Sequence, residues 1–180
     1  MTETENDSLD AFLAGIERRA LRMAEMATRD RDEALDLVQD AMLQFVRRYR
    51  DKPAAEWRPL FYRVLENRIL DWHRSRKSRG RWWVSLFADD ENGADPLEQF
   101  PSPGADNPLH VLQREHSMNR LNVVLQALPL RQQQVFLLRV WEGLDVADTA
   151  RAMGVGEGSV KTHLSRALAK LRKELSEEWP

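Results

Sequence analysis

A stretch of 21 residues near the middle of the chain limits the possible folds more than any other feature. It reads ADDENGADPLEQFPSPGADNP, from residue 88 to 108, and contains four prolines and two glycines. Proline lacks an amide hydrogen and fixes its φ angle, so neither a helix nor a central strand runs through this stretch. The stretch also has too few large apolar side chains to offset the entropy lost on ordering. We therefore predict a flexible acidic linker over residues 85–109, between lobes at 8–84 and 110–177.

Both lobes have the apolar periodicity of helices. Apolar residues recur every three or four positions, and no alternating run of β-branched residues indicates a strand. We therefore expect an all-α protein made of two small helical domains. In the first lobe we predict helices over 9–26 and 32–50, a loop over 51–56, and a third helix that begins near Trp57 with Pro59 in its first turn.

The second of these helices has two distinct faces. Its outer face carries the polar side chains of Asp36, Gln39 and Asp40. Its apolar stripe is expected to be buried and consists of Leu35, Val38, Met42, Phe45, Val46 and Tyr49.

The second lobe reads as a four-helix domain with a helix-turn-helix. A helix that buries Trp141 ends at Gly143, and Asp145 is a suitable N-cap for a short helix over 146–153. A turn at 154–156 then leads into a long last helix. A short helix, a glycine turn and a longer helix are typical of helix-turn-helix DNA-binding domains, although an ordinary helical hairpin has the same outline.

The long last helix carries the candidate base-reading residues. The second helix of such a motif enters the major groove with its N-terminal residues, so its early outward side chains contact base edges. We predict that these contacts come from Ser159, Lys161, Thr162, His163, Ser165 and Arg166. Lys170 lies further along the same helix and is expected to face the phosphates.

The third helix of the first lobe ends in a basic stretch. Six of its side chains can meet phosphates: Arg68, Arg74, Arg76, Lys77, Arg79 and Arg81. Aromatic residues are concentrated around them, and basic groups combined with flat rings suit single-stranded nucleic acid. The alternative interpretation is a solvated basic helix end that only complements the helix dipole.

The net charge of −2 conceals strong local fields. Residues 1–46 hold five basic and 11 acidic side chains, whereas residues 68–81 hold six basic side chains and one acid. Residues 82–113 hold six acids and neither Lys nor Arg. Because partners respond to local fields, the near-neutral total does not argue against nucleic-acid binding.

Three segments resemble bacterial sigma factors. The segment LPLRQQQVFLLRVWEGLDVADTARAMGVGEGSVKTHLSRALAKLRKEL resembles region 4, including its Leu-Pro, Glu-Gly-Leu and Glu-Gly-Ser-Val-Lys elements. DEALDLVQDAMLQFVRRYR resembles the polymerase-docking helix of region 2, and FYRVLENRILDWHRSRK resembles its promoter-opening helix. The presence of these two regions alone is similar to the extracytoplasmic-function (ECF) class.

This resemblance implies partners and roles for particular residues. Asp36, Gln39 and Asp40 would dock on core RNA polymerase. Region 4 would read the minus-thirty-five element of promoter DNA through the last helix. An anti-sigma factor is also implied. The loop at 51–56 would open and capture the minus-ten strand together with Asn67, Arg68, Asp71, Arg74, Arg76 and Lys77.

The promoter-opening helix departs from the family pattern at three positions. The family usually has Trp where Leu60 stands, a small residue at Leu65 and a basic residue at Glu66.

Other functional classes receive little support from the sequence. We expect no enzymatic activity, no catalytic residues and no cofactor, because no phosphate-binding glycine loop follows a strand. We expect no metal site, because the chain has no cysteine and its four histidines share no ligand spacing. The acidic start and the lack of a long apolar run predict a cytoplasmic protein without membrane insertion. The alternative function is a stand-alone helix-turn-helix regulator.

Overall fold

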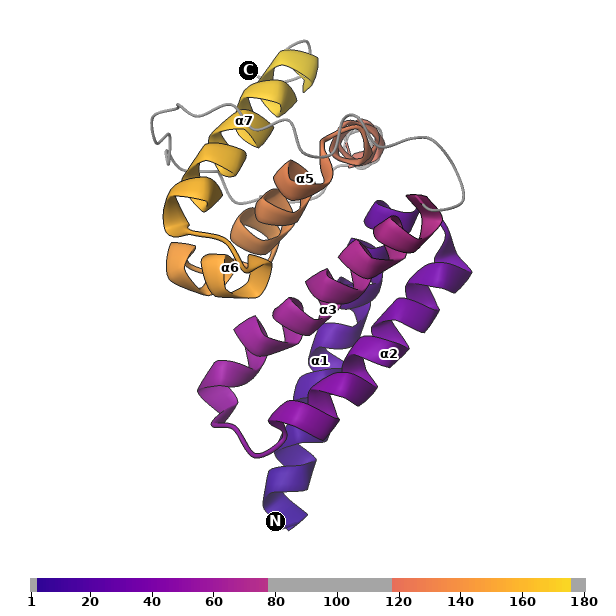
Figure 1. The fold of residues 1–180 in the computed structure, drawn as a ribbon, viewed down its shortest axis with the longest axis vertical. Helices are drawn as coiled ribbons and strands as arrows, with labels where there is room; N and C mark the ends of the chain where they lie inside the picture. Colours follow the sequence, from indigo (N-terminus) through magenta and orange to yellow (C-terminus); the bar gives the residue numbers. More distant parts are fainter. Residues whose placement is uncertain (1–2, 78–117, 176–180) are drawn as a thin grey trace, which may run out of the picture.

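Every regular element in the described part of the chain is a helix, which confirms the predicted all-α fold (Figure 1). The computed structural model describes residues 3–77 and 118–175. The predicted linker over 85–109 and the basic residues Arg79 and Arg81 lie outside these ranges, so they stay predictions.

The first lobe is a bundle of α1 (Glu3–Thr28), α2 (Arg31–Tyr49) and α3 (Ala54–Lys77). Its core contains a cluster of rings, in which Phe61 lies 5.7 Å from Phe45 and 6.2 Å from Phe12 between ring centres. Such edge-on ring pairs add to the stabilisation from apolar burial.

Two predictions about this lobe were wrong. α3 begins at Ala54, so residues 54–56 are helical and Pro59 lies in the second turn. The helix starts early because the amide of Glu56 closes the first turn on the carbonyl of Pro53, at 2.9 Å. Leu35 is 44% exposed, because the residues of α2 that face the core are Ala34, Val38, Ala41 and Phe45.

The second lobe contains a helix over 118–126, α5 (Leu130–Phe136), η1 (Leu137–Trp141), α6 (Val146–Met153) and α7 (Glu157–Leu175). The predicted turn signals are confirmed: Asp145 caps α6 by accepting from the amide of Asp148 at 2.6 Å, and Gly143 and Gly154 have φ angles of 65°. Positive φ values favour glycine, so these two residues end their helices.

A π-helical turn, η1, changes the end of α5. The amide of Glu142 donates to the carbonyl of Leu137 at 2.9 Å, five residues back, so the turn holds one more residue than an α-helical turn. Trp141, which we expected to be buried, is 37% exposed, and Glu142 is only 3% exposed. The extra residue in this turn rotates the residues that follow it around the helix axis, so Glu142 faces inward and Trp141 faces solvent.

The two lobes pack against each other through α3. This helix lies between the other helices of the first lobe and α6 of the second (Figure 1). Arg58 on α3 donates to both the backbone carbonyl and the carboxylate of Glu142, the latter at 3.0 Å, and Arg19 Nε lies 3.7 Å from the same carboxylate. Burial raises the pKa of Tyr62, and the neighbouring Glu142 carboxylate adds to the shift.

The contact between the lobes extends to the C-terminal end of α1. Arg29 Nη2 donates to the carbonyl of Gln126 at 2.6 Å, and Gln133 Nε2 donates to the carbonyl of Met26 at 3.4 Å. We call the surface formed by these contacts the lobe interface. Its polar contacts join Arg19, Met26, Arg29 and Arg58 of the first lobe to Gln126, Gln133 and Glu142 of the second. The lobes are therefore joined both near Glu142 and near Gln126 and Gln133.

Candidate nucleic-acid interface

One exposed face of α3 gathers three of the predicted single-strand contacts. Asn67, Asp71 and Arg74 are exposed and follow one another at intervals of four and three residues, so they share one side of the helix. Arg74 Nη1 lies 3.2 Å from Asp71 Oδ1. The face therefore presents an amide, a carboxylate and a guanidinium, which together can bind both a base and a phosphate.

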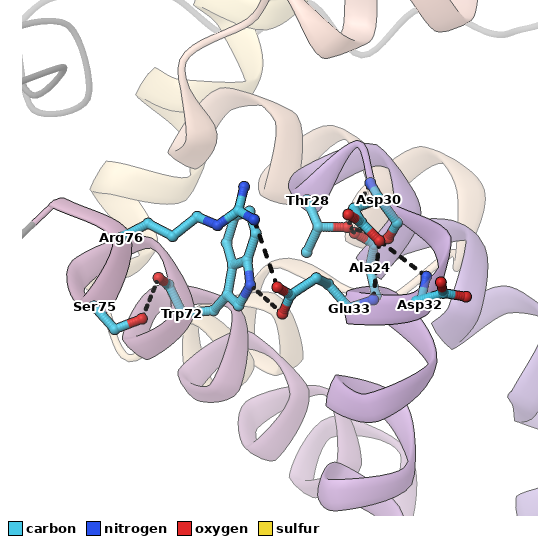
Figure 2. A network of polar contacts seen from close by, with 8 residues as sticks. All are labelled: Ala24, Thr28, Asp30, Asp32, Glu33, Trp72, Ser75 and Arg76. Atoms are coloured by element: carbon cyan, nitrogen blue, oxygen red, sulfur yellow. Dashed lines mark hydrogen bonds and ion pairs between the residues drawn. The ribbon is translucent and has the colours of Figure 1, made fainter. Parts of the chain in front are cut away.

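The basic end of α3 is attached to α2 by a residue that the sequence analysis did not select. Glu33 accepts from the indole nitrogen of Trp72 at 2.8 Å and from Arg76 Nη2 at 3.5 Å (Figure 2). The guanidinium carbon of Arg76 lies 4.7 Å from the centre of the Trp72 ring. Glu33 thereby fixes a flat ring and a cation side by side, the combination that suits a stacked base and its phosphate.

The start of α2 fixes the position of Glu33. Asp30 is the N-cap, and its Oδ1 accepts from the amides of Asp32 at 3.0 Å and Glu33 at 3.1 Å (Figure 2). An acid three residues after an N-cap usually returns to the amide of the cap. Here the side chain of Glu33 reaches across to α3 instead. The spacing alone would have revealed a capping box but not this contact.

The other predicted residues of the basic stretch differ in exposure. Arg76 is exposed and Arg68 is half-buried, with Nε inside the protein. Lys77 is the last residue of α3, and its side chain lies outside the described set. Beside them, burial lowers the pKa of His73, the charges of Arg29 and Arg76 lower it further, and the backbone of Ala27 opposes the shift.

The helix-turn-helix presents the N-terminal half of α7 to solvent. Ser159 and Lys161 are exposed, and Ser165 and Arg166 are half-buried. Thr162 is half-buried and its hydroxyl donates to the carbonyl of Gly158 at 3.0 Å, within the helix. The structure therefore brings most of the predicted base-reading residues together along the first three turns of the helix.

His163 does not face outward as predicted. It is 8% exposed and lies within the inner stripe of α7, beside Val160, Leu164 and Ala167. A period of 3.6 residues places position 163 among these apolar neighbours. Lys170 also has a contact within its own lobe, because its Nζ lies 3.0 Å from the carbonyl of Ala127.

The outer face of α2 combines charge with apolar surface. Asp36, Gln39 and Asp40 are exposed, as predicted from the pattern. Leu35 and Leu43, which are 44% and 50% exposed, lie four residues before and after Gln39. Two exposed leucines flanking acids on one helix face form an amphipathic surface that suits a protein partner.

Residues 3–77 and 118–175 contain no group of three or more His, Asp or Glu side chains that could hold a metal ion. Among the helices described, none is long and apolar enough to cross a membrane.

Two family matches cover most of the described chain. Residues 9–79 match the family described as sigma-70 region 2, and residues 118–171 match sigma-70, region 4. The two faces described above, on α2 and α3, fall within the first match, and α7 falls within the second.

Curated relatives match over most of their length. The RNA polymerase sigma-E factor of Streptomyces coelicolor is 33% identical over 86% of this chain and 78% of its own length. The ECF RNA polymerase sigma factor SigM of Mycobacterium tuberculosis is 31% identical over 88% of this chain and 72% of its own.

Two solved structures share the fold. The sigma factor RpoE in complex with the anti-sigma factor NepR, from Bartonella quintana, has a TM-score of 0.64 at 19% identity and covers 99% of this chain and 100% of its own. CnrH in complex with the cytosolic domain of CnrY has a TM-score of 0.60 at 16% identity, with 97% and 91% covered.

Replacing Glu33 by Ala should destabilise the first lobe by about 1 kcal/mol, because the half-buried indole N–H of Trp72 loses its acceptor. Urea unfolding at neutral pH measures this loss. Asp32→Ala is the matched control, since it removes an exposed acid from the same helical turn. An equal loss for both variants would show that Glu33 acts only as an acid at a helix start.

Proposed function

The chain belongs to the sigma-70 family of RNA polymerase sigma factors, in its ECF class, and we propose that it binds core polymerase and directs initiation at specific promoters. In this role it is an initiation factor and not an enzyme. The observation that carries the proposal is that one chain holds both region matches, each with an exposed face of suitable chemistry.

We assign capture of the melted minus-ten strand to α3. The exposed face of Asn67, Asp71 and Arg74 offers hydrogen-bonding groups to an unpaired base. The adjacent pair of Trp72 and Arg76 adds a ring and a cation. Stacking of one base on an aromatic ring is worth about 1–3 kcal/mol, enough to favour an opened strand at a few positions.

We assign reading of the minus-thirty-five duplex to α7. Ser159 and Lys161 are exposed at its first turn, with Arg166 one and a half turns further along. Arginine can bind guanine with two hydrogen bonds, and short hydroxyl side chains can meet any base edge. The exposed Arg172 and Lys173 lie toward the end of the helix, where phosphates are the expected partners.

We assign polymerase docking to the outer face of α2. Asp36 and Asp40 provide charge that steers association, and Gln39 adds a neutral amide between them. Leu35 and Leu43 provide apolar area that is lost from water on binding. The solved structures of RpoE and CnrH hold the anti-sigma factor NepR and the cytosolic domain of CnrY. By analogy, we propose that an anti-sigma factor also binds this chain.

Run-off transcription with core polymerase on fragments of genomic DNA tests the function. We expect initiation at a small set of sites when the chain is added, and their sequences define the promoter. No initiation above core polymerase alone would contradict the proposal. Tight sequence-specific binding by the chain alone, without polymerase, would instead support a stand-alone helix-turn-helix regulator.

Asp40→Arg should weaken binding to core polymerase at least about tenfold, or about 1.4 kcal/mol, because it reverses an exposed charge at the docking face. Binding is measured by titration with labelled chain, and circular dichroism checks the fold. Asp10→Arg, which reverses an exposed charge on α1, is the control. Unchanged affinity for the Asp40 variant would place docking elsewhere.

Arg166→Ala should cost about 1–3 kcal/mol at a single base pair of the minus-thirty-five element and relax specificity there. The measurement is transcription from promoters that vary in that element. Arg172→Ala, on the same helix, should reduce initiation by a similar factor on every promoter. A uniform loss for both variants would mean that Arg166 contacts a phosphate and not a base.

A further inference from the structure

Glu66 is a carboxyl group buried between the two lobes. It lies on α3, one helical turn after Tyr62, and is 1% exposed. Neither of its carboxyl oxygens makes a hydrogen bond of ordinary geometry within the described residues, and the side-chain nitrogen of the neighbouring Gln134 is likewise unpaired. An ionised carboxylate in such a place is costly, whereas a neutral carboxylic acid is much less so.

The groups that act on Glu66 come from the opposite lobe. Arg131 and Gln134, both on α5, face it, although the guanidinium of Arg131 already donates to the carbonyl of Met153 at 3.2 Å and to Gln134 Oε1 at 3.4 Å. Burial raises the pKa of Glu66 to about 8, and Arg131 and Gln134 oppose this shift only in part. The second lobe thus removes the Glu66 carboxyl group from water without fully balancing the negative charge of its ionised form.

Other ionisable groups along α3 face different partners. Arg58 and Tyr62 meet Glu142, together with Arg19 from α1. His73, two turns beyond Glu66, faces the backbone of Ala27 and the charges of Arg29 and Arg76. Tyr62 does not ionise near neutral pH, because its pKa is raised above an already high ordinary value. Among the groups of α3 packed at the lobe interface, Glu66 therefore stands out as the one that can change charge close to pH 8.

We propose that Glu66 is a proton-coupled latch between the lobes: they close while its carboxyl group is neutral, and they separate more readily when it ionises. The sign of the charge at position 66 matters because this side chain faces Arg131 of the other lobe. A basic group there would face Arg131 across the interface and oppose closing. The latch itself does not depend on the proposed function, but its importance for initiation does.

The direction of the pH dependence follows from the two environments of Glu66. In the closed form its pKa is about 8, and in the open form the side chain meets water and has the ordinary pKa of about 4.3. Below a pH of about 4.3 the Glu66 carboxyl group is neutral in both the open and the closed form, so its charge does not oppose closing. As pH rises from about 5 to about 7.5, the ratio of open to closed chain should rise about tenfold per pH unit, and it should level off above pH 8.

Fluorescence energy transfer in the free chain tests the latch. The chain contains no cysteine, so Asp51→Cys and Ala169→Cys introduce one labelling position in each lobe. Both positions are exposed and lie outside the lobe interface. Single-molecule efficiencies recorded from pH 5.5 to 8.5 give the open-to-closed ratio directly. Neither polymerase nor DNA is present, so the outcome is independent of whether the chain initiates transcription.

Three variants of Glu66 and one control variant separate Glu66 from other titrating groups. Glu66→Gln and Glu66→Leu cannot ionise, so both should stay closed with a pH-independent ratio. Glu66→Arg should be open across the whole range. Glu56→Gln, a half-buried change on the same helix, should titrate like the unmodified chain. The proposal would be overturned by an unmodified chain whose ratio is flat with pH, or by Gln and Leu variants that retain its full pH response. Circular dichroism confirms that each variant is folded.

Discussion

The carboxylate of Glu142 forms two ion pairs across the lobe interface. It is almost completely removed from water, whereas the side chains of Arg58 and Arg19 that meet it from the other lobe are 39% and 47% exposed. A fully buried ion pair is costly to break from one side. Here the arginines remain partly hydrated, so the attraction is screened and the pairing is weaker. The two ion pairs therefore contribute less to holding the lobes together than fully buried pairs would.

The closed arrangement leaves the DNA-facing residues accessible. Asn67 and Asp71 on α3, and Ser159 and Lys161 on α7, are all exposed while the lobes touch. The obstacle to promoter binding is distance. At about 3.4 Å per base pair, elements centred near positions ten and thirty-five are about 85 Å apart. In the closed form the lobes lie against each other, and even α1, a helix of 26 residues, spans only about 39 Å. The proposed function, in which one chain reads both elements at once, therefore requires the lobes to part.

How much of the fold and of the candidate site can be predicted from the sequence depends on how far apart in the chain the interacting residues lie. The ends of the helices near Gly143, Asp145 and Gly154 were predicted correctly, because caps and positive φ angles depend on residues within one turn. The faces of helices were less secure. In α2 the buried stripe includes Ala34 and leaves Leu35 exposed, and in α7 the buried stripe is wider than predicted and includes His163. The contact between Arg58 and Glu142 joins residues 84 positions apart, and no local pattern encodes it. Glu66 was evident only as a departure from the family pattern, without its partner.

The central claim is that the closed form must open before the chain can act, and a reversible cross-link tests it most directly. Arg29→Cys and Gln126→Cys place the only two thiols of the chain on opposite sides of the lobe interface, where a short thiol-reactive linker with a cleavable bond can join them. The account predicts that the cross-linked chain does not initiate transcription with core polymerase, and that cleaving the linker restores initiation to the level of the unlinked variant. Full initiation by the cross-linked chain would contradict it.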